Sequence, residues 1–407
     1  MKRKDIVQSV DKCITWIKNQ MCTYNKASWG IYERIRVDEN QRVCWTRPDC
    51  NAEFLYVLDL HKAVNEQDNE VYFSNILSWL LSKQNGKETE EKEGSFNFYF
   101  LDGSIVEEMG KSLYQNDNGK VLYCLLSLTE SSSNPKILAC CKRLADYWVR
   151  NQNEKGYYFN ENAKNMHFLA KGPCFVGWML MGMYKLYSIT QEEKYLESGR
   201  KALQYLFNEI ILEDRIRTSY ELEKFEDWRP YSSEISILLY ALTVASKYEA
   251  DETLKKAAGK KAEFMFDELK KMQHETGAIL NNNANANMEG LTLQVGAELC
   301  DLVYTQGFAL RALIEYYETF HDESALNAAY RLGEFLIGIQ CVNENELWDG
   351  AWRGSYNVVK KCWSGRCNQN NAIDEGGMYS IYTGWCCTNI MIGLLQLGKY
   401  VDETTIC

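Results

Sequence analysis

Helical segments of two kinds alternate along this chain, and the alternation narrows the folds that it can adopt. From Asp5 to Met21 the apolar residues fall on a single stripe, as in a helix that has one side in water. From Asn51 to Val64, by contrast, the stretch AEFLYVLDL surrounds the helix axis with apolar side chains, which predicts a helix covered on nearly all sides. Few segments have the pattern of a strand, so the chain is expected to be all-α.

The pair of segments recurs six times with a period of roughly 55 to 80 residues, which indicates a repeat of helical hairpins. The one-sided helices are expected at residues 5–21, 70–83, 135–151, 192–210, 252–273 and 324–340. The apolar helices are expected at residues 51–64, 117–130, 173–188, 232–248, 301–319 and 382–397. Six hairpins in a ring, with the apolar helices inside, form an (α/α)6 toroid, and we expect residues 1–407 to form this single domain.

Connections between the helices are of two lengths. About three to five residues lead from an inner helix to the next outer one, whereas roughly 20 to 40 lead from an outer helix to an inner one. Pro48, Pro173 and Pro230 stand at or just before the start of inner helices, where a missing N–H costs least. The long loops therefore meet at one rim, at the N-terminal ends of the inner helices. Because long ordered loops commonly carry function, we expect the functional site there.

The charge balance argues against some classes of partner. A formal net charge of −11 disfavours a nucleic acid or an anionic membrane, because both require a basic face. No stretch of about 18 apolar residues could span a bilayer, and the N-terminal residues are too amphipathic for a signal peptide. The 15 cysteines are odd in number and scattered through helical patterns, so we expect them to be reduced. These features predict a cytoplasmic protein.

The stretch NDNGKVLYCLLSL places Asp117 between two amides, Asn116 and Asn118, directly before an apolar run. Two interpretations of this acid are open. Like Asp301 and Ser232, it stands where an inner helix begins and could cap the free N–H groups there. Alternatively, burial at the mouth of an apolar core raises its pKa and suits it to acid and base catalysis. Asp117 is our first candidate for a catalytic acid.

Several other acids occupy the same rim. The candidates for a second carboxylate are Asp49, Glu53, Asp227, Glu234, Asp301 and Glu375, and we expect a catalytic role for Asp49, Asp227 or Asp301. In glycosidases, a separation of roughly 5 Å between the two carboxyls leads to retention and about 6.5 to 9.5 Å to inversion. The sequence leaves this distance open.

Aromatic, amide and arginine side chains gather in the long loops. The C–H face of a sugar can stack on an aromatic ring, and a guanidinium group suits a carboxylate or sulfate on the substrate. The same side chains could instead brace the loops or pair with neighbouring acids. The expected substrate-binding residues are Trp45, Arg47, Asn116, Asn118, His167, Trp228, Arg229, Glu234, Tyr304, Gln306, Trp352, Arg353, Glu375, Tyr382 and Trp385.

No metal or cofactor is expected. In the stretch GWCC, Cys386 and Cys387 are adjacent, whereas a good zinc chelate has residues between its cysteines. The glycine pair Gly376 and Gly377 fits no phosphate-binding loop.

Three stretches carry a resemblance to a known family. NDNGKVLYCLLSL, EDWRPYSSE and EGGMYSIYTGW, together with the alternating hairpins, resemble the six-hairpin glycosidase superfamily, which includes glycoside hydrolases, unsaturated glucuronyl hydrolases and some polysaccharide lyases. The resemblance covers nearly the whole chain. It implies catalytic carboxylates on the inner-helix rim, which supports Asp117 as the acid and Asp49, Asp227 or Asp301 as its partner. The paired histidines of related sugar epimerases are not evident at inner-helix positions.

The leading hypothesis is an intracellular glycoside hydrolase that cleaves short oligosaccharides, possibly bearing uronic acids or unsaturated sugars. A polysaccharide lyase or a sugar epimerase on the same toroid is the first alternative. A zinc-dependent prenyl- or lanthionine-type enzyme, with Cys300, Cys386 or Cys387 as ligands, is the second, and a non-catalytic glycan-binding toroid is the third. The expected partner is an oligosaccharide, with the oligomeric state left open.

Overall fold

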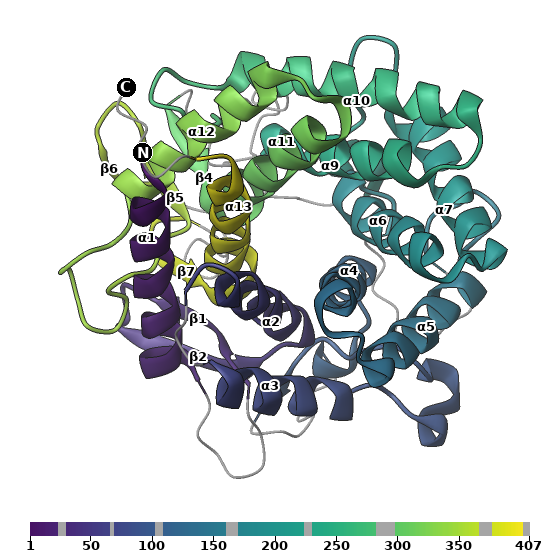
Figure 1. The fold of residues 1–407 in the computed structure, drawn as a ribbon, viewed down its shortest axis with the longest axis horizontal. Coiled ribbons are helices and arrows are strands. Elements are labelled where there is room, and N and C mark those ends of the chain that lie inside the picture. The colour runs from purple at the N-terminus through teal and green to yellow at the C-terminus, as the bar shows by residue number, and fades with distance from the viewer. Residues whose placement is uncertain are drawn as a thin grey trace.

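A computed structural model describes residues 1–22, 30–65, 69–101, 109–159, 170–223, 230–281, 298–365 and 377–401. Within these residues, twelve helices of nine residues or more form two concentric rings (Figure 1). The inner ring consists of α2 (Pro48–Lys62), α4 (Gln115–Ser132), α6 (Pro173–Thr190), α9 (Tyr231–Tyr248), α11 (Gly307–Phe320) and α13 (Asn389–Leu397). The outer ring consists of α1 (Arg3–Trp16), α3 (Glu70–Ser82), α5 (Pro135–Arg150), α7 (Glu193–Tyr205), α10 (Glu252–Met272) and α12 (Glu323–Gly338).

The inner ring is closed. Each inner helix packs against the next, and α13 packs against α2 to complete the circle (Figure 1). Helix α6 is buried from Pro173 to Leu186, whereas α5 buries only one side. This confirms the predicted (α/α)6 toroid, because the all-apolar segments became the inner helices and the one-sided segments the outer ones.

The two kinds of connection are also as predicted. Inner helices α4, α6 and α11 each end in a residue with left-handed backbone, namely Ser133, Gln191 and His321. Such a residue reverses the chain directly into the next outer helix. The inner helices therefore begin together at the other face of the ring, where the long loops enter them.

Four helices include a turn of π-helix that the periodicity did not reveal. These turns are η1 (Ile17–Met21) after α1, η4 (Leu206–Ile210) after α7, η5 (Leu302–Gln306) before α11 and η6 (Thr383–Thr388) before α13. The last two open inner helices at the rim. A π turn widens the helix locally and is common at functional sites. These two turns therefore set the positions of Tyr304 and Trp385 at the rim.

Two small antiparallel sheets cover part of the rim, although the sequence indicated few strands. One has the order β3-β2-β1-β7 and the other β4-β5-β6. Their strands are β1 (Tyr32–Arg36), β2 (Gln41–Thr46), β3 (Phe100–Leu101), β4 (Leu299–Asp301), β5 (Ser355–Asn357), β6 (Cys362–Trp363) and β7 (Ser380–Tyr382). The first sheet joins a loop near the N-terminus to one near the C-terminus, since Arg34 pairs with Tyr382.

Three of the remaining short elements lie in connections between the helices, and the fourth, η7, follows α13. They are η2 (Lys87–Lys92), η3 (Met109–Lys111), α8 (Ser219–Glu223) and η7 (Gly398–Tyr400). No helix in the described ranges is long and apolar enough to cross a membrane.

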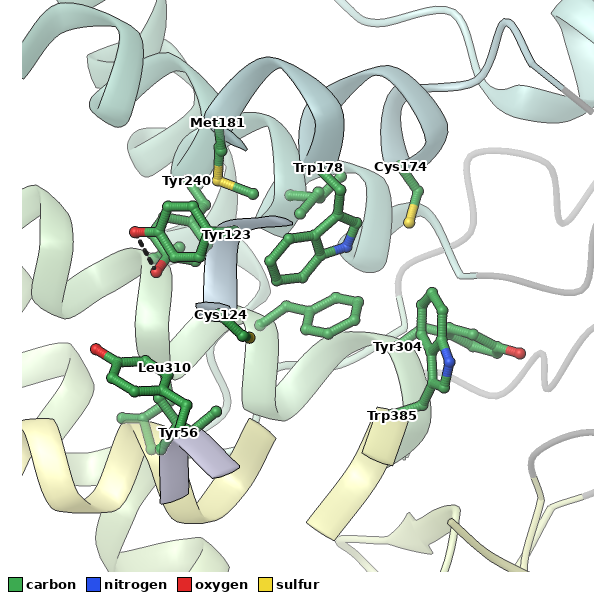
Figure 2. Packing of buried hydrophobic residues seen from close by; sticks show 14 of the residues in the cluster. Tyr56, Tyr123, Cys124, Cys174, Trp178, Met181, Tyr240, Tyr304, Leu310 and Trp385 are labelled. Carbon is green, nitrogen blue, oxygen red and sulfur yellow. Dashed lines mark hydrogen bonds between the residues drawn. The ribbon is translucent and has the colours of Figure 1, made fainter. Parts of the chain in front are cut away.

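Polar groups are present inside the inner ring, among aromatic side chains. The hydroxyl of Tyr240 donates to that of Tyr123 over 3.0 Å (Figure 2). The fully buried guanidinium of Arg311 lies 5.3 Å from the centre of the Trp178 ring and donates to Oδ1 of Asn389. Below the rim, side chains of the described residues therefore fill the centre of the ring.

Candidate active site

Arg47, the residue before α2, is the centre of the candidate site. Its Nη1 donates to Glu33 (2.7 Å), its Nε and Nη2 donate to the two oxygens of Asp49 (3.0 and 2.8 Å), and its Nη2 also donates to Asp117 Oδ2 (2.8 Å). All four residues are more than nine-tenths buried. Three carboxyl groups from β1, α2 and α4 thus share one guanidinium group.

The start of α2 explains part of this geometry. Pro48 occupies the first helical position, where its fixed φ fits and its missing N–H is not needed. Asp49 therefore lies in the first turn of α2, as Asp117 lies in the first turn of α4. Because α2 and α4 are neighbours in the inner ring, their first turns bring the two acids to one guanidinium group.

Asp49 has no exposed surface and is held on several sides. Besides the bonds from Arg47, its Oδ2 accepts from Trp385 Nε1 (2.8 Å), and Lys120 Nζ lies 3.7 Å away. Burial by itself would raise the pKa of the Asp49 carboxyl, but Arg47 and Lys120 outweigh it and hold that pKa below its usual value. Asp49 is thus ionised at neutral pH.

Lys120 lies one turn after Asp117 in α4 and is fully buried. Its Nζ is 2.9 Å from Glu53 Oε1 and 3.4 Å from the centre of the Trp385 ring. Burial alone would lower the pKa of Lys120, but Glu53 and Asp49 raise it above its usual value. Glu53 also accepts from Asn389 (2.8 Å). The ion pair of Lys120 with Glu53 therefore lies next to the cluster centred on Arg47 and supports it.

Asp117 differs from Asp49 in both access and protonation. Its side chain retains 9% of its surface. Burial raises its pKa, and the carboxylates of Asp49 and Glu33 add to this effect. Arg47 and Lys120 oppose it, and the result is a pKa of about 8. A protonated carboxyl thus stands beside an ionised one, the arrangement from which acid and base roles arise.

Asp301 is a helix cap. Its Oδ2 accepts from the backbone N–H of Tyr304 (2.7 Å) at the start of η5, and burial raises its pKa to about 7 despite the N–H groups that it binds. The capping prediction is therefore confirmed for Asp301. In α4 and α9 the N-cap positions are Tyr114 and Pro230, which form no side-chain cap, so Asp117 and Ser232 are not N-caps, although Asp117 does lie in the first turn of α4. In α4 the acid pairs with Arg47 instead.

Aromatic rings lie below and beside the acids. Trp385 packs edge to face with Tyr304, with ring centres 5.4 Å apart, and with Phe308 at 5.8 Å. Phe308 in turn packs on Trp178 at 5.4 Å. Figure 2 shows Tyr304, Trp385 and Trp178 among the buried side chains of the core. These side chains form an aromatic floor under the cluster centred on Arg47.

A second aromatic group comes from the four-stranded sheet. Tyr382 accepts from Arg34 Nη1 (2.6 Å), and the Arg34 guanidinium lies 5.6 Å from the centre of the Trp45 ring. Half-buried Trp45 stacks on Tyr99 with ring centres 4.4 Å apart. Phe98, also half-buried, lies under the guanidinium of Arg47 at 4.5 Å. Two predicted residues, Trp45 and Tyr382, are thus in the wall beside the site.

Other predicted binding residues hold rim loops in place. The side chain of Asn118 bonds the N–H and C=O of Phe96 (2.8 and 3.0 Å), and that of Gln306 bonds those of Ile279 (2.9 and 2.7 Å). Glu234 accepts from the N–H of Ser219, the first residue of α8 (2.6 Å). Since their polar atoms bond the backbone, we assign Asn118 and Gln306 to the support of the site.

Two predicted binding residues lie elsewhere in the fold. Trp352 is fully buried, and its Nε1 donates to the C=O of Leu336 in α12 (2.8 Å). Arg353 pairs with Glu344 (2.6 Å) and lies over the ring of Trp348. Among the described residues, neither is bonded to the cluster centred on Arg47. Five further predictions, Asp227, His167, Trp228, Arg229 and Glu375, lie outside the described residues.

Sequence reasoning missed Glu33, Lys120, Phe98 and Trp178. One signal was present for Lys120. In the stretch GKVLYCLLSL, a lysine sits in a helix predicted to be covered on nearly all sides, and a buried lysine requires a nearby carboxylate. Nothing comparable marked Glu33, whose role depends on a strand pairing between distant segments. Among the described residues, no group of three or more His, Cys, Asp or Glu side chains is arranged to hold a metal ion.

No protein-family model matches the sequence, and no curated protein matches it significantly. Solved structures do match over nearly full length. A sugar epimerase from a ruminal bacterium has a TM-score of 0.72 at 15% identity, covering 98% of this chain and 99% of that one. Cellobiose 2-epimerase from Bacillus thermoamylovorans has 0.68 at 12%, covering 98% and 99%. An unsaturated glucuronyl hydrolase specific for heparin has 0.63 at 11%, covering 99% and 100%.

The closed ring and these likenesses define a helical toroid with a polar rim. The fold is therefore the (α/α)6 toroid that the sequence predicted.

Proposed function

We propose that this protein is a carbohydrate-active enzyme, a glycoside hydrolase of short oligosaccharides with Asp117 as its catalytic acid. The observation that carries the proposal is the protonated Asp117 carboxyl at the rim, held by Arg47 beside the ionised Asp49. A carboxylic acid with a pKa near 8 is protonated at neutral pH and can give a proton to a leaving oxygen.

The roles of the two neighbouring acids follow from their contacts. Oxygens of Asp49 and Asp117 lie 2.8 Å from the same nitrogen of Arg47, so the pair is closer than the about 6.5 to 9.5 Å of inverting glycosidases. Asp49 is fully buried and bonded at both oxygens, which suits a fixed counter-charge and not a nucleophile. Asp117 donates the proton, and Asp49 keeps Arg47 and Lys120 in place.

The substrate is an oligosaccharide in this proposal. Half-buried Trp45 and Phe98 beside the acid suit the C–H faces of sugar rings. For an unsaturated uronic sugar, Asp117 would protonate the double bond in place of the glycosidic oxygen. Asp227 and Glu375, predicted from the sequence alone, are the candidates for the base that activates water.

A sugar epimerase is the second candidate. The observation that favours it is that Asp49 is already bonded at both oxygens, so the adjacent carboxylate does not serve as the water-activating base of a hydrolase. Two of the solved structures with this fold are described as sugar epimerases. In that case Asp117 would exchange a proton at carbon.

One experiment separates the two candidates. The purified protein is incubated in D2O with a panel of neutral, uronic and unsaturated oligosaccharides, and products are followed by mass and NMR. Hydrolysis predicts fragments that together gain one water. Epimerisation predicts an isomer of unchanged length with deuterium at the exchanged carbon. Bond cleavage without added water would identify a lyase and contradict both.

A further inference from the structure

A buried arginine inside the inner ring, Arg311 of α11, has no carboxylate as a direct partner. Its side chain is fully buried, and the centres of three aromatic rings, those of Tyr123, Trp178 and Tyr240, lie 5.9, 5.3 and 5.4 Å from its guanidinium. Among the described residues, no acid lies within ion-pair distance of it, and its Nε has no hydrogen-bond partner. A buried charge without compensation is costly, so the counter-charge of Arg311 has to act from further away.

Asn389, the first residue of α13, provides the connection to that counter-charge. Nη1 of Arg311 donates to Oδ1 of Asn389 (2.5 Å), and Nδ2 of Asn389 donates to Oε1 of Glu53 (2.8 Å). All three side chains are fully buried. The amide has one favourable orientation, because the reverse would turn its NH2 group towards a cation that only donates and its oxygen towards a carboxylate that only accepts. Asn389 thus joins Arg311 to Glu53.

The connection continues to the acids of the candidate site. The same oxygen of Glu53 lies 2.9 Å from Nζ of Lys120, which in turn lies 3.7 Å from Oδ2 of Asp49. Asp49 shares the guanidinium of Arg47 with Asp117. Burial raises the pKa of Asp117, and Arg47 and Lys120 lower it. How strongly Lys120 lowers that pKa depends on its position between Glu53 and the two acids of the rim.

Loss of the charge on Arg311 would have a definite sign at Asp117. In the part of the chain that the structure describes, the charged groups that act on the Asp117 carboxyl are Arg47 before α2, Asp49 in α2, Lys120 in α4 and Glu33 in β1. These are two cations and two acids, and Glu53 and Arg311 add one charge of each kind. Without Arg311 the buried network would contain one positive charge fewer, and Asp117 would hold its proton more tightly.

The backbone brings α11 and α13 together at this point. The two helices are neighbours in the inner ring (Figure 1). A Cβ on Gly307, one turn before Arg311 in α11, would come within 2.7 Å of the Cβ of Asn389. Because glycine has no side chain, the two helices can approach this closely. The contact between Arg311 and Asn389 therefore depends on the close packing of two inner helices.

We propose that Arg311 and Asn389 are positioning residues for the candidate catalytic acid. Through Glu53 they hold the ammonium group of Lys120 near the rim, and they thereby set the pH above which Asp117 no longer carries its proton. The inference rests on the proposed role of Asp117 and adds to it a part of the buried core that does not touch the substrate.

The test follows the protonation of Asp117 directly. The protein is labelled with 13C at the carboxyl carbons of aspartate and titrated by NMR, and the Asp117 signal is the one that is missing from Asp117→Asn. Arg311→Gln removes the charge, and Arg311→Lys keeps it. Arg200→Gln is the matched control, because Arg200 pairs with Glu249 (2.5 Å) at the end of α9 that is opposite the rim. Thermal unfolding shows whether each variant is folded.

The inference predicts that the titration midpoint of Asp117 is higher by about 0.5 to 1 pH unit in Arg311→Gln than in the wild type, as expected for the loss of one charge from a buried network. Arg311→Lys and Arg200→Gln should stay within about 0.2 units of the wild type, because the first keeps the charge and the second lies outside the network. An unchanged midpoint in Arg311→Gln, or an equal rise in Arg200→Gln, would overturn the inference.

Turnover separates this result from the proposed function. If the proposed function holds, the alkaline limit of kcat/KM rises in Arg311→Gln together with the midpoint of Asp117. A raised midpoint in a protein that converts none of the sugars would support the role of Arg311 in the protonation of Asp117 and reject the proposed function.

Asn389→Ala provides a second test if Arg311→Gln does not fold. This change leaves the charges of Arg311 and Glu53 in place and removes the amide between them. Glu53 would then attract Lys120 more strongly and draw its ammonium group away from the rim. The midpoint of Asp117 should again rise, by at least about 0.3 units. A folded Asn389→Ala protein with a midpoint within about 0.2 units of the wild type would overturn the inference.

Discussion

Arg47 and Asp117 lie 70 residues apart in the sequence, and in the folded chain Nη2 of Arg47 donates to Oδ2 of Asp117 over 2.8 Å. The same nitrogen also binds Asp49. This shared contact explains how a carboxyl can be held firmly at the rim and still have a pKa of about 8, because the charge of Arg47 is divided among three acids.

The first prediction concerns the effect of pH on stability. The pKa of Asp117 rises from near 3.9 in the unfolded chain to about 8 in the folded one. Its stabilising contribution is therefore complete below about pH 4 and is lost as the pH rises towards 8. Asp117→Asn, which stays neutral, should gain stability relative to the wild type between pH 5 and 9. Urea unfolding at several pH values measures this, and a constant difference would contradict the assigned pKa.

Arg47→Met should be strongly destabilising. Buried Glu33 and Asp49 would lose their common cation and Asp117 its hydrogen-bond donor, and removal of one partner from a buried ion pair typically costs about 3 to 5 kcal/mol. The control is Arg215→Met, because Arg215 pairs with Glu221 at the surface, where such a pair contributes about 0 to 1 kcal/mol. Denaturant unfolding compares the two. Equal losses would mean that the buried cluster does not depend on Arg47.

Gly119→Ala tests the close approach of α4 and α6. The added Cβ would meet the backbone of Trp178 at 2.7 Å, and overpacking of this kind costs about 1 to 3 kcal/mol. Gly338→Ala is the matched control, since nothing lies within 4 Å of a Cβ there. That change should be neutral or stabilising by up to about 1 kcal/mol. Thermal unfolding of both variants checks the contrast, and a neutral Gly119→Ala would contradict it.

Asp301 should not be essential for catalysis. Its carboxylate caps η5, and asparagine is also a good cap. Asp301→Asn is therefore expected to keep activity within a few-fold of the wild type, whereas Asp301→Ala should lose about 0.5 to 2 kcal/mol of stability. A folded Asp301→Asn protein with no activity would assign Asp301 a role in proton transfer.

The helices were predictable because their pattern is periodic. The distribution of apolar residues in each segment indicates whether its helix is buried on all sides or on one side. The assignment of helices to the inner or outer ring, and the position of the rim, therefore followed from segments such as α2 and α4. The strands were not predictable in the same way. The β1 and β7 strands are short, and they pair only because distant loops meet over the rim.

The site was predictable in part for a similar reason. Asp117 and Arg47 stand next to helix starts, where sequence patterns are informative, but their shared contact depends on the packing of α2 on α4. Glu33 and Trp178 depend wholly on tertiary contacts. Asp117 lies in the first turn of α4, as the capping interpretation expected, but its carboxyl is bonded by Arg47, which precedes a different helix.

The most direct test of the account is the product mass in H2(18)O for the wild type and for Asp117→Asn, with Asp251→Asn as a control, because Asp251 caps α10 on the outer ring. We predict one 18O atom per cleaved bond for the wild type and the control, lost activity above about pH 8 in both, and no cleavage by Asp117→Asn. A folded Asp117→Asn protein that cleaves the same sugar at the wild-type rate would contradict the account.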